Sequence, residues 1–284
     1  MTGYLEGILV ILAINVVAAY GAFLPMAAGQ LNLGVAGFMS IGAYTSAYLS
    51  NALGLPALLT VFLGAAFTGL VALVVAVPVL RTRGIYLALA TFAVGQIVQS
   101  TILNLEFVGG AAGYPVAAFL DFGVIAAFAA GTVVVVYLLF QTRFGLNVTA
   151  VHDDEIVADL FGVNTRRYQA AAFALGAAVA GLAGALYAHH FSVIEAQRFN
   201  VLMSIYIVLY VLLGGTQTVF GPFVGAAIFT LLPELLRASA EWRYAIFAVL
   251  IILLMAVRPQ GLLTGATLRR LLAWRRPAGA EAGG

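Results

Sequence analysis

Long hydrophobic stretches alternate with short polar connections along almost the whole chain. Nine of these stretches predict helices within a membrane. They cover residues 7–24, 31–49, 57–80, 85–103, 119–140, 169–189, 201–213, 220–236 and 244–257. The seventh is short and runs almost directly into the eighth, so we expect broken or re-entrant helices among them. The pattern predicts an all-α, polytopic integral membrane protein with about nine transmembrane helices, within a range of about eight to ten.

The longest hydrophilic stretch before the C-terminal tail covers residues 141–168, and it predicts one short amphipathic helix of about ten residues. Asp153 or Asp154 can cap its N-terminus, and Gly162 supplies a C-terminal stop. Four apolar residues share one face of this helix: Ile156, Val157, Leu160 and Phe161. Its length of roughly 15 Å is half of a bilayer core, so the helix is expected outside the membrane. The apolar face either folds back on its own protein or fits a groove of a partner.

Composition supports a single integral domain. Of the 284 residues, 63% are hydrophobic and only 8% are charged, whereas a soluble domain has about a quarter of its residues charged. We expect a transmembrane domain over residues 1–262, which includes a cytoplasmic loop at 141–168. Residues 263–284 are expected to form a basic, disordered cytoplasmic tail that lies near anionic headgroups rather than on nucleic acid.

The basic residues predict the orientation. With the N-terminus outside, ten arginines fall on inner segments and three on outer segments, which is a positive-inside bias. The inner arginines are Arg81, Arg83, Arg143, Arg166, Arg167, Arg258, Arg269, Arg270, Arg275 and Arg276, and the outer ones are Arg198, Arg237 and Arg243. The sequence therefore predicts a periplasmic N-terminus and a cytoplasmic C-terminus.

Several kinds of chemistry are absent from the sequence. All thirteen basic residues are arginines, so the chain lacks the lysine of a P-loop ATPase, and it has no cysteine for a disulfide or a thiolate site. Charged residues fall at or beyond the ends of the expected spans, whereas proton-coupled carriers need titrating groups within them. Adjacent His189 and His190 point about 100° apart on a helix, so a membrane-interface position is favoured over a shared metal. We expect no catalytic residue, no metal and no bound cofactor.

Glycines are clustered in two places. The first segment, LNLGVAGFMSIGAY at 31–44, contains Asn32, Gly34, Gly37 and Gly42; the second, GGTQTVFGPFVGA at 214–226, contains Gly214, Gly215, Gly221 and Pro222. Small residues allow helices to pack closely, which explains most membrane glycines. The same clusters could instead be breaks that line a water-filled path, with one early and one late cluster as in an inverted-repeat transporter. Thr91 and Gln96 are further polar candidates for such a path.

Four separated motifs resemble one known family, the membrane permease subunits of ATP-binding-cassette (ABC) importers for branched-chain amino acids. The matching segments are LNLGVAGFMSIGAYTSAYL at 31–49, LRTRGIYLALATFAVGQIV at 80–98, DDEIVADLFGVNTRRYQAAAFALGAAVAGLAGALYA at 153–188 and GGTQTVFGPFVGA at 214–226. The third segment is the most specific. Val35 stands where many members have histidine, and Gln217 replaces a glycine of the last motif.

The resemblance implies a partner for the short amphipathic helix. In this family the corresponding loop is the coupling element that docks on the ATPase subunit. The carried-over coupling residues are Glu155, Ile156, Val157, Ala158, Leu160, Phe161 and Gly162. ATP and Mg²⁺ would be bound by two separate cytoplasmic ATPase subunits, and this chain would not itself be an enzyme.

The resemblance also implies a complete transport system in the bacterial inner membrane. A related second permease subunit would form a heterodimer with this chain, and a periplasmic binding protein would deliver a leucine-like solute. The outer loop at 105–118 is the expected gate or docking element, with Gly109, Gly110, Gly113 and Tyr114 as its key residues. The alternatives are a permease of the same type for amides or urea, nucleosides or sugars, and a self-sufficient secondary carrier or channel.

Overall fold

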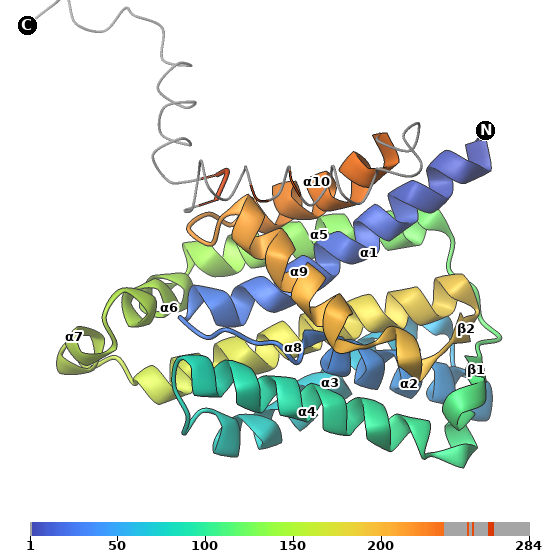
Figure 1. Cartoon of the computed structure of the whole chain (residues 1–284), viewed down its shortest axis with the longest axis horizontal. Helices are drawn as coiled ribbons and strands as arrows, with labels where there is room; N and C mark the ends of the chain where they lie inside the picture. The colour runs from blue at the N-terminus through green and yellow to red at the C-terminus, as the bar shows by residue number, and fades with distance from the viewer. Residues whose placement is uncertain (1, 236–248, 250–251, 253–260, 264–284) are drawn as a thin grey trace, which may run out of the picture.

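The computed structural model describes residues 2–235, 249, 252 and 261–263. Eight longer helices form the body of the described part, and most of them run roughly along one direction (Figure 1). These are α1 (Thr2–Ala27), α2 (Val35–Leu53), α3 (Ala57–Val79), α4 (Ile85–Leu103), α5 (Phe122–Gln141), α8 (Thr165–Phe191), α9 (Val201–Gly214) and α10 (Gly221–Leu235). Each overlaps one of the first eight expected spans. The ninth, 244–257, lies outside the described residues except for Val249 and Ile252, and so does the expected tail except for Leu263.

The predicted polytopic membrane character is confirmed. Within the described residues, five helices are long and apolar enough to cross a membrane: Gly3–Ala27, Ala57–Val79, Ile85–Leu103, Phe122–Gln141 and Thr165–Phe191. Helices α9 and α10 are apolar but shorter. The count of nine transmembrane helices stays a prediction.

Short elements connect the long helices at the two ends of the bundle. At one end lie α6 (Arg143–Asp153) and α7 (Glu155–Leu160). At the other end lie the 3₁₀ helices η1 (Glu106–Val108), η2 (Gly110–Ala112) and η3 (Ala196–Arg198), together with strands β1 (Tyr114–Pro115) and β2 (Val193–Ile194) (Figure 1). The strands pair antiparallel, Tyr114 opposite Ile194 and Pro115 opposite Val193, so the described chain is all-α apart from one very small ladder.

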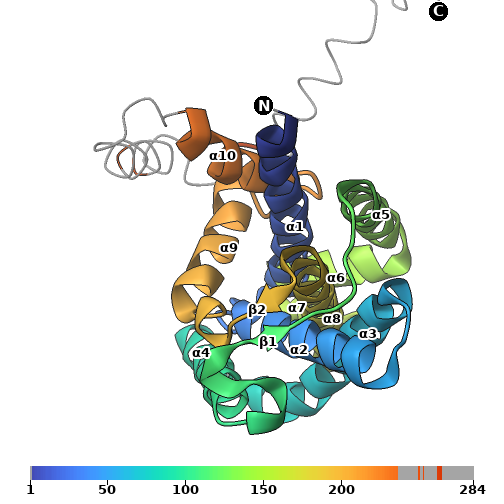
Figure 2. The ribbon, with the colours of Figure 1, turned by 90° about the vertical axis from the view of Figure 1, so that its right-hand side faces the viewer.

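Helix α8 lies at the centre and packs against α1, α2 and α3 (Figure 2). Its glycines make these contacts close. A Cβ atom at Gly176 would come within 2.6 Å of the Gly21 carbonyl oxygen on α1, and one at Gly181 would overlap the side chain of Thr68 on α3. Small residues thus bring the helix backbones together, which is the usual way to pack helices in lipid. Only about a fifth to a third of the residues in the apolar windows of α3, α4 and α5 are buried, as expected for the periphery of the bundle.

Side-chain caps explain where several helices begin. Asp121, Thr142, Asp154, Asn164 and Asn200 each accept a backbone N–H from the first turn of the following helix. These caps shift two boundaries from the expected ones. Helix α5 begins after Asp121 rather than at residue 119, and α8 begins four residues earlier than expected, because Asn164 caps it.

Candidate functional site

The polar segment at 141–168 forms two helices rather than one. Thr142 caps the first, α6, which ends at Asp153. Asp154 has extended backbone angles (φ −156°, ψ 107°), and its carboxylate accepts the N–H groups of Ile156 and Val157 at 2.9 and 3.0 Å. Asp154 is therefore the cap of α7, and Asp153 is not. Gly162 follows the end of α7 and has φ +82°, a left-handed conformation that favours glycine.

Helix α7 has six residues, shorter than the expected ten, and its apolar face points away from the protein. Leu160 and Phe161 are 82% and 84% exposed, and Ile156 and Val157 are exposed as well. Ala158 alone faces the body of the protein and is buried. The alternative in which the apolar face folds back on its own bundle is therefore wrong for this structure. Four apolar side chains lie at the tip of the molecule without an intramolecular site.

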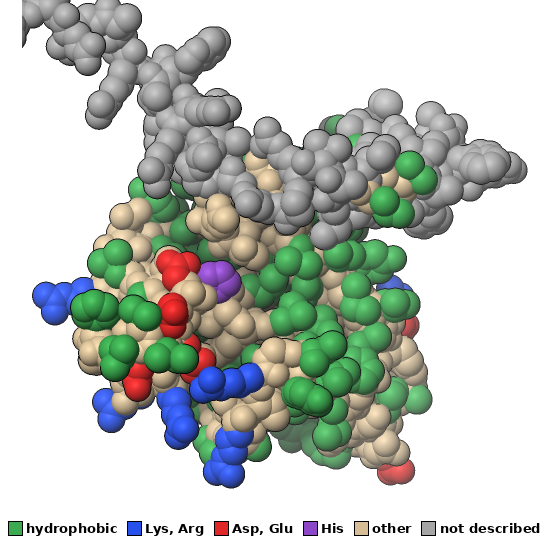
Figure 3. Space-filling model, turned by 60° about the vertical axis from the view of Figure 1, so that its left-hand side comes forward, with side chains coloured by type: hydrophobic (Ala, Val, Ile, Leu, Met, Phe, Trp, Pro, Cys, Tyr) green, Lys and Arg blue, Asp and Glu red, His purple; other side chains and the backbone are tan. Residues whose placement is uncertain are grey.

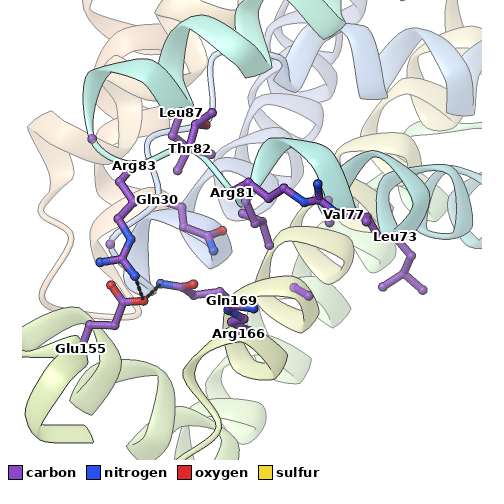
Figure 4. A pocket seen from close by; sticks show the side chains of 15 residues that line it. Gln30, Leu73, Val77, Arg81, Thr82, Arg83, Leu87, Glu155, Arg166 and Gln169 are labelled. Atoms are coloured by element: carbon purple, nitrogen blue, oxygen red, sulfur yellow. Dashed lines mark hydrogen bonds and ion pairs between the residues drawn. The ribbon is translucent and has the colours of Figure 1, made fainter. Parts of the chain in front are cut away.

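The base of α7 is attached to two other segments. The Glu155 carboxylate lies 3.3 Å from the Arg83 guanidinium in the α3–α4 connection, and the Gln169 amide on α8 donates to the same carboxylate at 3.4 Å (Figure 4). Charged side chains of both signs gather over this end of the molecule, with hydrophobic side chains among them (Figure 3). The end thus combines an exposed apolar tip with a charged surround, which suits contact with another protein.

The first glycine cluster brings together some of the expected path residues. Residues 28–34, between α1 and α2, are not helical. The buried Asn32 side chain accepts the N–H of Gly34 at 2.8 Å, and the Thr91 hydroxyl on α4 accepts the N–H of Leu33 at 3.0 Å. Side chains therefore satisfy the backbone of this break, as a break within a bundle requires.

The other members of the first cluster make packing contacts. A Cβ atom at Gly37 would lie 2.7 Å from the Cα of Gly95 on α4, and one at Gly42 would overlap Gly181 on α8. Gln96 lies elsewhere on α4, on the wall of an open groove that Ser100 and Asn104 also line.

The second glycine cluster forms the junction between α9 and α10. Gly214 and Gly221 pack on one another, and Gly215 has φ +109°. Pro222 is the second residue of α10, where the absent N–H of a proline is tolerated. The contacts of both clusters agree with the packing interpretation of membrane glycines, and their role in a path stays a prediction.

The loop before β1 is held in place by hydrogen bonds. Gly109, Gly110 and Gly113 have φ between +49° and +85°, so each adopts a conformation that suits glycine. Tyr114 pairs with Ile194 in the ladder. The Asn51 side chain donates to the Pro115 carbonyl at 2.6 Å and accepts the Ala117 N–H at 3.0 Å. Gating or docking by this loop stays a prediction.

The buried His189 side chain joins α8 to two other helices and to the segment before α5, which the sequence did not indicate. It is fully buried near the end of α8. Its Nδ1 lies 2.8 Å from the Ala118 carbonyl, and its Nε2 lies 2.9 and 3.1 Å from the hydroxyls of Ser46 and Thr60. A neutral ring with its proton on Nδ1 donates to the carbonyl and accepts from a hydroxyl, which satisfies both nitrogens. Within the described residues no cluster of metal-binding side chains occurs.

Comparison with known proteins gives this geometry a context. Residues 4–256 match the family described as branched-chain amino acid transport system / permease component. The high-affinity branched-chain amino acid transport system permease protein LivM of Escherichia coli (strain K12) is 30% identical over 271 residues, 83% of this chain and 64% of LivM. The corresponding LivH protein of the same organism is 31% identical over 124 residues, 43% of this chain and 40% of LivH.

A shorter match reaches a different solute class. The nucleoside ABC transporter permease protein NupC of Lactococcus lactis subsp. cremoris (strain MG1363) is 39% identical over 56 residues, 20% of this chain and 18% of NupC. No solved structure matches the chain significantly. The match over residues 4–256 covers far more than half of the sequence. This chain therefore belongs to the family of permease components of branched-chain amino acid transport systems.

Proposed function

We propose that this chain is the membrane-spanning permease subunit of an ABC importer that moves branched-chain amino acids, leucine-like first, delivered by a periplasmic binding protein. The observation that carries the proposal is the exposed apolar face of α7 in a member of this family. A transporter that works alone has no need of a large apolar tip outside the membrane. A transporter driven by a separate ATPase subunit does need a surface on which that subunit docks.

In this proposal α7 is the coupling element. Two cytoplasmic ATPase subunits bind ATP and Mg²⁺, and one of them takes the tip of α7 into a groove. Leu160 and Phe161 are the main anchors because they are the most exposed of the four apolar residues. Glu155 links movement of α7 to the α3–α4 connection through Arg83 and to α8 through Gln169. Such a link can transmit a push on the tip into the bundle.

A second, related permease subunit completes the membrane part. The similarity of this chain to both LivM and LivH supports a pair of related subunits rather than two identical ones. The solute path lies between the two, and the junctions at 28–34 and 214–222 act as hinges. An inverted repeat is part of the same proposal, since one non-helical junction falls early and one late in the chain.

The proposed location is the bacterial inner membrane, with the α7 end in the cytoplasm and the N-terminus in the periplasm. Within the described residues, arginines gather at the α7 end: Arg81, Arg83, Arg143, Arg166 and Arg167. Arg198 alone belongs to the opposite end, which supports this orientation by the positive-inside rule. Residues 1–262 would then be the permease domain, and 263–284 a cytoplasmic tail.

The test of docking is the double variant Leu160→Asp, Phe161→Asp, co-expressed with the cognate ATPase subunits. Two charges at the anchor positions should abolish co-purification of the ATPase while membrane insertion is unchanged. Phe107→Asp is the matched control, because Phe107 is 64% exposed at the opposite end of the bundle. Unchanged co-purification in the double variant would reject α7 as the docking element.

The short match to NupC favours a second candidate, a permease of the same type for nucleosides. A thermal-shift panel on the co-purifying binding protein separates the two solutes, because that protein selects what is delivered. Stabilisation by leucine, isoleucine or valine supports the first proposal, and stabilisation by nucleosides alone supports the second. Uptake that stops when the proton gradient collapses, with ATP maintained, would instead indicate a secondary carrier.

A further inference from the structure

A cavity of about 660 Å³ opens beside the base of α7. Its walls come from the end of α3, the α3–α4 connection, the start of α8 and the turn after α1 (Figure 4). The polar lining residues that matter here are Gln30, Arg81, Arg83, Glu155, Arg166 and Gln169. The proposed transport function assigns no ligand to this cavity, which is separate from the exposed tip of α7.

The cavity carries an excess of positive charge. Three arginines and one glutamate line it, so the formal lining charge is three minus one, or +2. Arg83 is paired with Glu155. Neither Arg81 nor Arg166 belongs to an ion pair within the part of the chain that the structure describes. Two arginines without an ion pair among the described residues therefore line one cavity, and guanidinium groups suit a phosphate or carboxylate.

A buried amide points to the same ligand. Gln30 is 2% exposed, and neither its Nε2 nor its Oε1 has a hydrogen-bond partner among the described residues. Its side chain projects from the turn after α1 into the space that Arg83 and Gln169 also face (Figure 4). A buried amide without hydrogen-bond partners lowers the stability of the folded state. A glutamine at this position therefore suggests that a ligand supplies the missing hydrogen bonds.

One wall of the cavity is apolar and continues onto the membrane-facing surface. Leu73 and Val77 lie one turn apart on α3, which is one of the five helices long and apolar enough to cross a membrane. Val77 is 65% exposed, and the Arg81 side chain extends towards it (Figure 4). A small inorganic anion would use the arginines and leave this wall uncovered. A ligand with both a phosphate and a hydrocarbon chain would cover both.

We propose that this cavity binds the phosphate group of an anionic phospholipid. The phosphate lies between Arg81 and Arg166 and accepts a hydrogen bond from the Gln30 amide, and an acyl chain follows Leu73 and Val77. Basic pockets at the ends of transmembrane helices are suited to such headgroups. Because Glu155 is the first residue of α7, the bound headgroup adjoins the base of that helix. The site depends neither on the solute nor on ATPase docking.

The test is lipid retention by the full-length chain, purified in detergent with the subunits that accompany it and followed by native mass spectrometry. We expect phosphatidylglycerol to be retained and phosphatidylcholine to be removed. The double variant Arg81→Gln, Arg166→Gln should lower phosphatidylglycerol affinity by about tenfold or more, since each lost charged hydrogen bond to phosphate is a strong one. Arg143→Gln, Arg167→Gln is the matched control, because these arginines lie at the same end but outside the cavity lining.

Four results would count against the proposal. Equal retention of both lipids, or unchanged affinity in the Arg81, Arg166 double variant, would overturn it. Displacement of the lipid by millimolar inorganic phosphate would keep the phosphate chemistry but overturn the lipid as its source. Gln30→Leu removes the amide at similar volume, and it should weaken phosphatidylglycerol retention while the lipid-free protein remains folded. Unaltered retention in Gln30→Leu would also count against the site.

Discussion

The two ends of the bundle differ in how their connecting segments are attached to the helices. At the α7 end a six-residue helix projects apolar side chains outwards, and it is attached by one cap, one exposed ion pair and one amide. At the other end the β1–β2 ladder, the Asn51 bridge and the His189 junction bind the connections to the helices they join. The first end leaves its apolar surface for another molecule to cover, whereas the second satisfies its own polar groups.

Under the proposed function, this difference favours the α7 end as the one that responds to the ATPase subunit. Local stability is low where few buried contacts and few hydrogen bonds hold a segment. Helix α7 can therefore tilt at its base at small cost, while the ladder end keeps its geometry. An importer driven from one side needs this asymmetry, because a push at one end must move helices rather than deform the other end.

The largest effect on stability is expected from His189→Ala, at the end of the bundle that carries the β1–β2 ladder. The substitution removes a fully buried ring and leaves the Ala118 carbonyl and two hydroxyls without their present partner. We expect a loss of about 3 kcal/mol in the free energy of unfolding, from the cavity and the unsatisfied groups together. Thermal unfolding of the detergent-purified protein measures it. His190→Ala is the control, since His190 is less buried and makes one hydrogen bond, to the Leu120 carbonyl. Equal losses of unfolding free energy in the two variants would mean that the hydrogen bonds of His189 contribute nothing particular to stability.

The sequence could not reveal this junction because its partners are remote along the chain. Ser46 and Ala118 lie 143 and 71 residues from His189. Periodicity and caps report on neighbours within a few residues, so they placed the eight described spans well and His189 only near the end of one. The adjacent histidines gave no indication of which ring is buried.

Next in size is Asn51→Ala. The amide joins the end of α2 to the backbone on both sides of Val116, with one bond given and one received. Losing both bonds at a partly exposed site should cost about 1–2 kcal/mol and loosen β1. Hydrogen exchange at the Ala117 amide should accelerate strongly. Asn104→Ala is the comparison, because its amide donates to Ser100 within the same helical end; if both variants changed exchange at Ala117 alike, the bridge would not hold the loop.

The sequence predicted the chemistry of the α7 end better than its outline. The apolar face and the Gly162 stop were right, because both depend on local spacing and backbone conformation. The predicted helix was too long, and α6 was missed because it mixes polar and apolar residues over only eleven positions and its start depends on the single side chain Thr142. The choice between Asp153 and Asp154 needed backbone angles that neighbouring aspartates do not reveal in sequence.

A smaller effect is expected from Asp154→Ala. This change removes the acceptor for two backbone N–H groups of α7 and should cost about 1 kcal/mol of local helix stability. Exchange of the Ile156 and Val157 amides would accelerate, with the global unfolding temperature almost unchanged. Asp153→Ala is a closely matched control, because Asp153 ends α6 and caps nothing in α7. Equal acceleration in both variants would contradict the assignment of the cap.

The smallest expected effect on stability belongs to Leu160→Asp and Phe161→Asp, the same changes that should abolish ATPase docking. Both side chains are more than four-fifths exposed, so charging them should alter the free energy of unfolding by less than about 0.5 kcal/mol. The comparison of the two ends depends on a separation of the two effects. The α7 variants should affect ATPase binding strongly and folding hardly at all, and His189→Ala should do the reverse. Thermal unfolding and ATPase co-purification, measured on the same preparations, provide both values. A marked drop in unfolding temperature for Phe161→Asp would mean that the tip packs against its own protein in the membrane, and the contrast between a free end and a self-satisfied end would then fail.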